Sequence, residues 1–238
     1  MNFSLKDFAF ISDVGLQRSQ NEDQWLLDTT LSLAAIFDGM GGHDGGEIAS
    51  LLAKEYCENM GQEYPLSDML LEADRYIASH QSEGSARPMG TTAVALRWDP
   101  SGASYAWAGD SRLYALAKGQ SIDLLSEDHT VAMRRAKRGE IKAHLAKKEP
   151  DGHMLTSCLG LFGQGFEQAF VEKGYYTFAK PTRFLLCSDG LTDLIADEEL
   201  ESNLNFKKTA PDCAKRLIEL GLERGASDNI SFIILDFY

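Results

Sequence analysis

Apolar and polar positions alternate or cluster in ways that divide the chain into runs of predicted strands with pairs of predicted helices between them. A partly alternating stretch at 7–14 and an apolar run at 32–37 predict two strands. Apolar residues then recur at helical spacing after Gly46 and again after Ser67, so each of these two helices should bury one face. Turn residues separate three further strand-like stretches, which form an expected antiparallel meander at 91–98, 103–108 and 112–117.

The second half of the chain repeats this arrangement. Strand character returns at 175–178 and at 183–187, and 197–204 and 211–224 follow as predicted helices. The last predicted strand is 230–237. Because strands come in runs with paired helices between them, we expect an α+β fold, with two central antiparallel sheets flanked by helices in four layers (α-β-β-α), rather than a doubly wound parallel sheet.

One segment departs from this pattern. Residues 127–149 are markedly charged, and their apolar positions are too sparse for a core element. We therefore expect a single domain over 1–238 that carries an exposed, mobile flap at about 127–155.

Composition narrows the class of protein. The chain has 36 acidic and 23 basic residues, a formal net charge of -13, which argues against binding to a nucleic-acid backbone. The four cysteines form no C-x-x-C pair, so neither a zinc ribbon nor a redox motif is indicated. The first 15 residues lack the apolar stretch of a signal peptide, and no run approaches the ~20 apolar residues that span a bilayer. These features predict a cytoplasmic protein without a membrane anchor.

The candidate chemistry lies in acidic residues at turns beside predicted strands. They occur at Glu22-Asp23, Asp38-Gly39, Gly109-Asp110, Asp189-Gly190 and Asp228-Asn229. A single Asp in such a turn is most often solvated, but five turns that end or begin apolar strands favour a preorganised site. Oxygen ligands without a Cys or His cluster indicate magnesium, manganese or calcium rather than zinc.

Six motifs carry a resemblance that covers nearly the whole chain. They are Arg18-Ser-Gln-Asn-Glu-Asp23, Asp38-Gly-Met-Gly-Gly-His43, Gly90-Thr-Thr92, Gly109-Asp-Ser-Arg112, Ser188-Asp-Gly-Leu-Thr-Asp193 and Asp228-Asn-Ile-Ser231. In this order they resemble the metal-dependent serine/threonine protein phosphatases, the type-2C or PPM family, and in particular its compact bacterial members. Each motif alone is weakly specific, whereas the set is highly specific.

The resemblance implies two Mn²⁺ or Mg²⁺ ions and a third ion in bacterial relatives. Asp38 would bridge the two core ions, and Asp189 and Asp228 would complete the first site. Glu22 and the backbone carbonyl of Gly39 would serve the second site, with Asp23 in the outer shell.

Asp110 would hold the third ion together with Asp189. Two such cations would turn a bridging water into a hydroxide nucleophile and stabilise charge on the phosphoryl group. Arg18 would bind the substrate phosphate, because its planar fork of donors matches two phosphate oxygens. From spacing alone, Arg18 could equally form a surface ion pair with Glu22 or Asp23.

This chain departs from the family pattern at the residue that would protonate the leaving group. Animal members of the family carry a His directly after the equivalent of Asp38-Gly39, whereas this chain has Met40, whose thioether has no proton to donate. His43 and a metal-bound water remain as the two candidate acids.

The resemblance therefore implies a protein serine/threonine phosphatase. It would act on phosphorylated proteins in signal transduction and oppose a bacterial serine/threonine kinase. Two alternatives stay open: a catalytically silent phosphoprotein-binding module of the same fold, and another two-metal phosphoesterase such as a nuclease, which the acidic composition disfavours.

Overall fold

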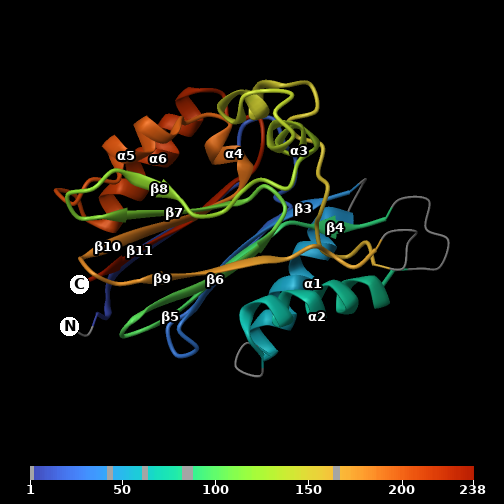
Figure 1. Cartoon of the computed structure of the whole chain (residues 1–238), viewed down its shortest axis with the longest axis horizontal. Helices are drawn as coiled ribbons and strands as arrows, with labels where there is room; N and C mark the ends of the chain where they lie inside the picture. Colours follow the sequence, from blue (N-terminus) through green and yellow to red (C-terminus); the bar gives the residue numbers. More distant parts are fainter. Residues whose placement is uncertain (1–2, 42–44, 61–63, 82–87, 163–166) are drawn as a thin grey trace.

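Two antiparallel sheets stack face to face between two layers of helices (Figure 1). The computed structural model describes residues 3–41, 45–60, 64–81, 88–162 and 167–238. Within these ranges the predicted four-layer α+β sandwich is confirmed.

The first sheet has the strand order β1–β11–β10–β7–β8, and each neighbouring pair is antiparallel. Its strands are β1 (Leu5–Asp13), β7 (Arg112–Ala117), β8 (Ile122–Leu124), β10 (Thr182–Cys187) and β11 (Ile230–Phe237). All side chains of β10 and β11 are buried, because sheet and helices cover their two faces. Pairing of β1 with β11 also brings Ser4 and Tyr238 together, and these residues exchange two backbone hydrogen bonds.

The second sheet has the order β2–β3–β5–β6–β9, with the short β4 paired to the end of β3. Its strands are β2 (Asp23–Asp28), β3 (Leu33–Met40), β4 (Gly90–Thr91), β5 (Ala93–Asp99), β6 (Gly102–Ala108) and β9 (Glu172–Thr177). The sequence pattern did not predict β2, whose apolar residues do not alternate. Its register places Asp23 directly opposite Asp38, so this strand matters for the site.

Paired helices cover the outer face of each sheet. α1 (Gly45–Met60) and α2 (Leu66–Ser79) lie on the second sheet, and α4 (Asp189–Thr192), α5 (Asp197–Asn203) and α6 (Ala210–Glu223) lie on the first (Figure 1). The start of α6 follows from its sequence, because the side chain of Thr209 caps the backbone N–H of Asp212 and Pro211 occupies the first turn.

Hydrophobic residues are buried in three clusters of the described chain. One lies between α1–α2 and the second sheet, one between the two sheets, and one between the first sheet and α4–α6. Strand alternation divides β3 between two of them, since Phe37 packs under the helices and Ile36 packs between the sheets. A buried Phe or Ile contributes roughly 1.5–3 kcal/mol, so these clusters fix the strand ends that carry the site.

The charged segment expected as a flap contains α3 (Val131–Lys137) and the 3-10 turn η1 (Ala143–Lys148), which the apolar pattern did not predict. Polar contacts hold this segment in place. Arg135 pairs with Asp151 at 2.9 Å, and Lys147 reaches Asp193 of the α4 turn at 2.7 Å. Hydrophobic periodicity cannot reveal elements that depend on ion pairs. The mobility of this segment stays a prediction.

Two further features concern the environment of the chain. All four cysteines are buried and free of disulfide bonds. Among the helices of the described ranges, none combines the length and the hydropathy needed to cross a bilayer.

Candidate metal centre

A cleft of about 500 Å³ gathers residues from seven separate stretches of the chain. The predicted site residues that line it are Arg18, Glu22, Asp38, Gly39, Asp110, Asp189 and Asp228. Asp23 lies behind this wall, 3% exposed. The structure therefore brings all the predicted site residues to one place, while the metal role of each stays a prediction.

The backbone of Asp38, near the end of β3, is fixed by two threonines. Thr92 Oγ1 accepts a hydrogen bond from Asp38 N at 3.1 Å, and the Asp38 carbonyl accepts from Thr92 N at 2.8 Å and from Thr91 Oγ1 at 3.0 Å. Burial, followed by repulsion from Asp23 and Asp189, raises the pKa of Asp38 well above its ordinary value. Thr91 and Thr92 belong to a recognised motif, but the sequence did not distinguish this positioning role from an ordinary strand.

Gly39 allows three backbone segments to meet beside Asp38. A Cβ atom at this position would lie 2.3 Å from the carbonyl oxygen of Gly46 and 2.6 Å from that of Glu22. The hydroxyl of Ser50, on α1, donates to the same Glu22 carbonyl at 2.6 Å. Only glycine permits this approach, which brings the start of α1 and the backbone of Glu22 to the end of β3.

Asp189 is the first residue of α4, and it lines the same cleft as Asp38. Burial raises the pKa of Asp189, and the negative charges of Asp193 and Asp228 raise it further. The ammonium of Lys147 acts in the opposite direction.

Asp110 follows a turn that only glycine adopts easily, since Gly109 has a φ of +106°. Burial raises the pKa of Asp110 well above its ordinary value, with repulsion from Asp189 as the next cause. His129 braces this turn, because the Gly109 N–H donates to His129 Nδ1 at 3.2 Å while Nε2 lies 2.9 Å from Glu172 Oε2. No spacing in the sequence indicated this role of His129.

Asp23 supports the site from behind. Ser188 Oγ donates to Asp23 Oδ2 at 2.9 Å and so joins β2 to the start of α4. Burial raises the pKa of Asp23 to about 7, with the charge of Asp189 adding to the shift. This placement agrees with the outer-shell position that the family resemblance implies.

Arg18 contacts a different carboxylate from those considered in the sequence. Its Nη2 donates to Asp228 Oδ2 at 2.7 Å, and both side chains are partly exposed at the cleft. Arg18 therefore does form an ion pair, but not with Glu22 or Asp23, the two partners considered in the sequence analysis. Asp228 is the partner instead, because the segment that carries Arg18 folds over the start of β11.

Asn229 holds that segment in place, a role that the sequence did not assign to it although it belongs to one of the quoted motifs. Its Oδ1 accepts from Glu22 N at 2.9 Å, and its Nδ2 donates to the carbonyls of Val14 and Gln20, each at 2.9 Å. This one side chain thus fixes both ends of the loop that presents Arg18 and Glu22.

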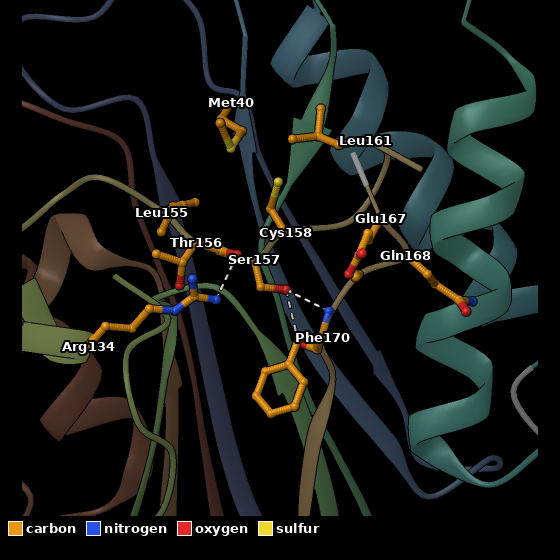
Figure 2. A pocket seen from close by; sticks show the side chains of 11 residues that line it. Met40, Arg134, Leu155, Thr156, Ser157, Cys158, Leu161, Glu167, Gln168 and Phe170 are labelled. Carbon is orange, nitrogen blue, oxygen red and sulfur yellow. Dashed lines mark hydrogen bonds between the residues drawn. The ribbon is translucent and has the colours of Figure 1, made fainter. Parts of the chain in front are cut away.

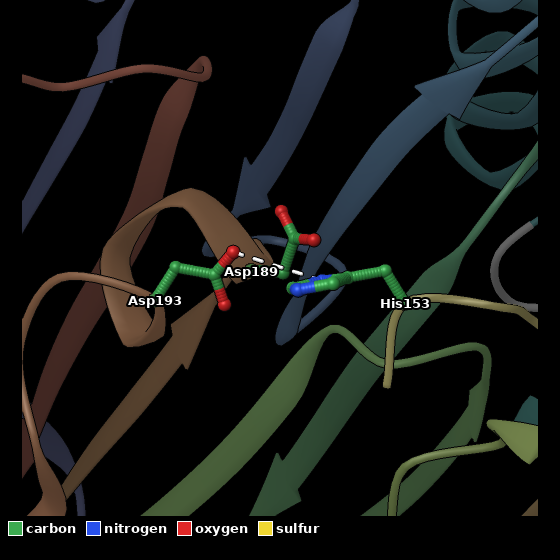
Figure 3. Close-up of side chains that lie close together, drawn as sticks. All are labelled: His153, Asp189 and Asp193. Carbon is green, nitrogen blue, oxygen red and sulfur yellow. Dashed lines mark ion pairs between the residues drawn. The ribbon is translucent and has the colours of Figure 1, made fainter. Parts of the chain in front are cut away.

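A cluster at the flap side of the cleft joins η1 to α4. The cluster consists of His153, Asp189 and Asp193 (Figure 3). A ring nitrogen of the histidine and one carboxylate oxygen of each aspartate lie within 4.8 Å of one another. The ammonium of Lys147 lies 2.7 Å from Asp193 Oδ1, and His153 Nδ1 lies 3.8 Å from Asp193 Oδ2. The cluster therefore links the flap electrostatically to the turn that carries Asp189. His43, the histidine considered as an acid, lies outside the described residues.

The chemistry of the cleft fits divalent metal ions. Burial and mutual repulsion raise the pKa values of Asp38, Asp110 and Asp189, so these carboxylates are poorly stabilised as anions by the protein alone. Hard cations would relieve both effects, and a donor set dominated by carboxylate oxygen suits Mg²⁺ or Mn²⁺.

Comparisons with known proteins show which family the chain resembles. The family model described as Protein phosphatase 2C matches residues 8–138. The serine/threonine protein phosphatase PstP of Mycobacterium tuberculosis is 31% identical over 96% of this chain and 44% of its own length, and the serine/threonine phosphatase stp of Listeria monocytogenes is 30% identical over 95% and 94%. The crystal structure of the catalytic domain of PstP in complex with two manganese ions superposes with a TM-score of 0.80, at 29% identity and 99% coverage of both chains.

Proposed function

Since this chain belongs to the protein phosphatase 2C family, we propose that it hydrolyses phosphoserine and phosphothreonine esters of other proteins with the help of two Mn²⁺ or Mg²⁺ ions. The chain spans about half the length of PstP, at 44%, and nearly all of the Listeria phosphatase, at 94%. The observation that carries the proposal is the convergence of carboxylates from separate elements on one cleft, with a guanidinium beside them.

Named residues would hold the ions. Asp38 would bridge them, Asp189 and Asp228 would complete one site, and Glu22 with the carbonyl of Gly39 would complete the other. When bound, such ions supply an activated water and neutralise charge on the phosphoryl group. The manganese-bound relative of the same fold supports this assignment.

The protein itself positions these groups and binds the substrate. Asn229, Thr91 and Thr92 fix the backbones that present Glu22 and Asp38, which holds the site in the geometry needed for reaction. Arg18 would turn its guanidinium to the substrate phosphate and bind two of its oxygens. Asp110 would join Asp189 in binding a third ion.

The leaving-group oxygen needs a proton from a source other than residue 40. Met40 lines the cleft but carries no acidic proton. We propose that water in the cleft supplies it rather than His43, because His43 follows two glycines and suits a turn.

We further propose a cytoplasmic protein that acts in signal transduction against a serine/threonine kinase. Four buried cysteines without disulfide bonds fit a reducing compartment. The relatives named as bacterial serine/threonine phosphatases support phosphorylated proteins as substrates.

The proposed activity is tested with matched peptides that contain phosphothreonine, phosphoserine or phosphotyrosine, assayed with and without Mn²⁺. Release of phosphate from the first two, only with metal, is the expected result. A protein that binds the phosphopeptides but releases no phosphate would be a silent binding module. Cleavage of DNA or RNA in place of the peptides would identify a nuclease instead.

A further inference from the structure

A second pocket lies directly beside the catalytic cleft, between residues 155–161 and 167–170 (Figure 2). Its volume is about 220 Å³, far above the roughly 10–15 Å³ that a single water requires. Met40 and Leu155 line both the pocket and the cleft. The two spaces are therefore adjacent, and one ligand can occupy both.

Apolar side chains form much of the pocket wall. They are Met40, Leu155, Cys158, Leu161, Ala169 and Phe170. Met40 is 37% exposed and Phe170 is 58% exposed. Large apolar side chains left open beside a reactive cleft are typical of a binding surface, and methionine adapts well to different partners.

The two walls are fixed to each other by hydrogen bonds. Ser157 Oγ donates to the Phe170 carbonyl at 3.0 Å and accepts from Phe170 N at 2.9 Å (Figure 2). The buried carboxylate of Asp74 accepts from Gly160 N at 2.7 Å and from Ala169 N at 2.9 Å. The described part of the pocket is thus preformed, so a ligand would not have to order its backbone.

Two opposite charges line the pocket. Arg134 lies on α3, and its Nη2 makes a long contact of 3.5 Å with the Thr156 carbonyl. Glu167 lies on another part of the wall. A charged side chain in the pocket would meet both an attractive and a repulsive partner, so the apolar surface should decide what binds.

We propose that this pocket is a recognition subsite for a large apolar side chain, such as leucine, one or two residues from the phosphorylated residue of a protein substrate. The inference rests on the proposed phosphatase function. Two residues of extended chain span at most about 7 Å, which suits a pocket adjacent to the cleft. Phe170 is the specificity-determining residue, because it is the most exposed of the apolar residues that line the pocket.

The test uses three phosphothreonine peptides that differ only at the two residues on each side, which are all leucine, all alanine or all aspartate. kcat/KM is measured for the Mn²⁺-loaded protein. We expect the leucine peptide to exceed the alanine peptide by about ten-fold or more, the discrimination typical of an apolar pocket. Phe170→Ser should bring this ratio close to one, and Phe170→Leu should restore most of it.

Phe8→Ser is the matched control, because Phe8 is a 44% exposed phenylalanine on β1 and lines neither space. It should leave the leucine-to-alanine ratio unchanged. Equal hydrolysis of all three peptides would overturn the subsite and leave the phosphatase function standing. Preference for the aspartate peptide would show that Arg134 decides specificity and would also overturn the proposal. Hydrolysis of none would refute the phosphatase function and, with it, the subsite.

Discussion

Nη2 of Arg18 lies 2.7 Å from Oδ2 of Asp228, so the candidate phosphate-binding residue and a candidate metal ligand neutralise each other's charge. The contact raises the pKa of Arg18, chiefly through the hydrogen bond to Asp228. Metal ions bound by Asp228 would compete for this carboxylate and leave the guanidinium available to a phosphate.

This relationship predicts the ranking of two Arg18 variants. A hydrogen bond to a charged group contributes about 1.5–3 kcal/mol, so Arg18→Ala should lower kcat/KM for a phosphothreonine peptide roughly ten- to hundred-fold. The loss should come mainly through KM. Arg18→Lys should lose less, because it keeps the charge but not the bidentate geometry. If both changes had equal and negligible effects, Arg18 would only form the ion pair with Asp228 and would not bind the substrate phosphate.

The raised pKa of Asp23 predicts how stability depends on pH in chelator. Its folded pKa of about 7 lies above the unfolded value near 4, so the folded state binds the proton more tightly. Stability from this group is full below a pH of about 4 and is lost progressively as the pH rises from there through 7. Between pH 6 and pH 8 the loss should be on the order of 1 kcal/mol.

Urea unfolding in chelator at the two pH values measures this loss. Asp23→Asn provides the control, because it keeps the shape of the side chain and removes the titration. The variant should show a flatter pH dependence than the parent protein. A parent protein that gains stability from pH 6 to pH 8, with a slope that Asp23→Asn does not change, would contradict the assignment.

Asp110→Ala should slow the reaction without removing the two core metal ions. Asp110 stands on the turn after Gly109 and would bind a third ion, whereas Asp38, Asp228 and Glu22 would still serve the two core ions. Native mass spectrometry in Mn²⁺ should therefore still find two bound ions, while kcat falls. Loss of both ions in this variant would place Asp110 in the core site instead.

A buried ion pair far from the cleft predicts a purely structural effect. Arg183 is fully buried and binds both carboxylate oxygens of Asp236 at 2.6 Å, and it also donates to the carbonyls of Leu204 and Lys208. Asp236→Ala should destabilise the protein by about 3–5 kcal/mol, because it leaves a buried charge unpaired. Thermal unfolding measures the loss. The conservative Asp236→Asn should also destabilise, and a stability equal to that of the parent in both variants would refute the account.

Much of the fold could be predicted from apolar periodicity. The strand at 112–117 and the last strand at 230–237 were predicted with the bounds that β7 and β11 have, because each is a short apolar run between clear turn residues. β2 and α3 were missed. β2 lacks alternation, and α3 is held in place by ion pairs and a Thr130 cap that carry no hydrophobic signal.

The candidate site was predicted from motif residues, and the structure brings those residues to one cleft. The family resemblance is confirmed by the matched family model and the relatives. The residues that position the site could not be predicted from sequence spacing. Asn229, His129 and Ser188 act through contacts with residues between 20 and 215 positions away in the chain. The ion-pair alternative for Arg18 named Glu22 or Asp23 instead of Asp228 for the same reason, since Asp228 is distant in sequence and adjacent only in the fold.

The central claim is that hydrolysis depends on metal ions held around Asp38, and one titration tests it most directly. Phosphate release from a phosphothreonine peptide is followed as Mn²⁺ is added to metal-depleted protein, for the parent and for Asp38→Asn. Circular dichroism confirms that both remain folded. The account predicts that the parent is inactive in chelator and gains activity with Mn²⁺, and that Asp38→Asn is folded but inactive at every concentration. Substantial turnover by the parent with metal confirmed absent, or near-normal activity of Asp38→Asn, would contradict it.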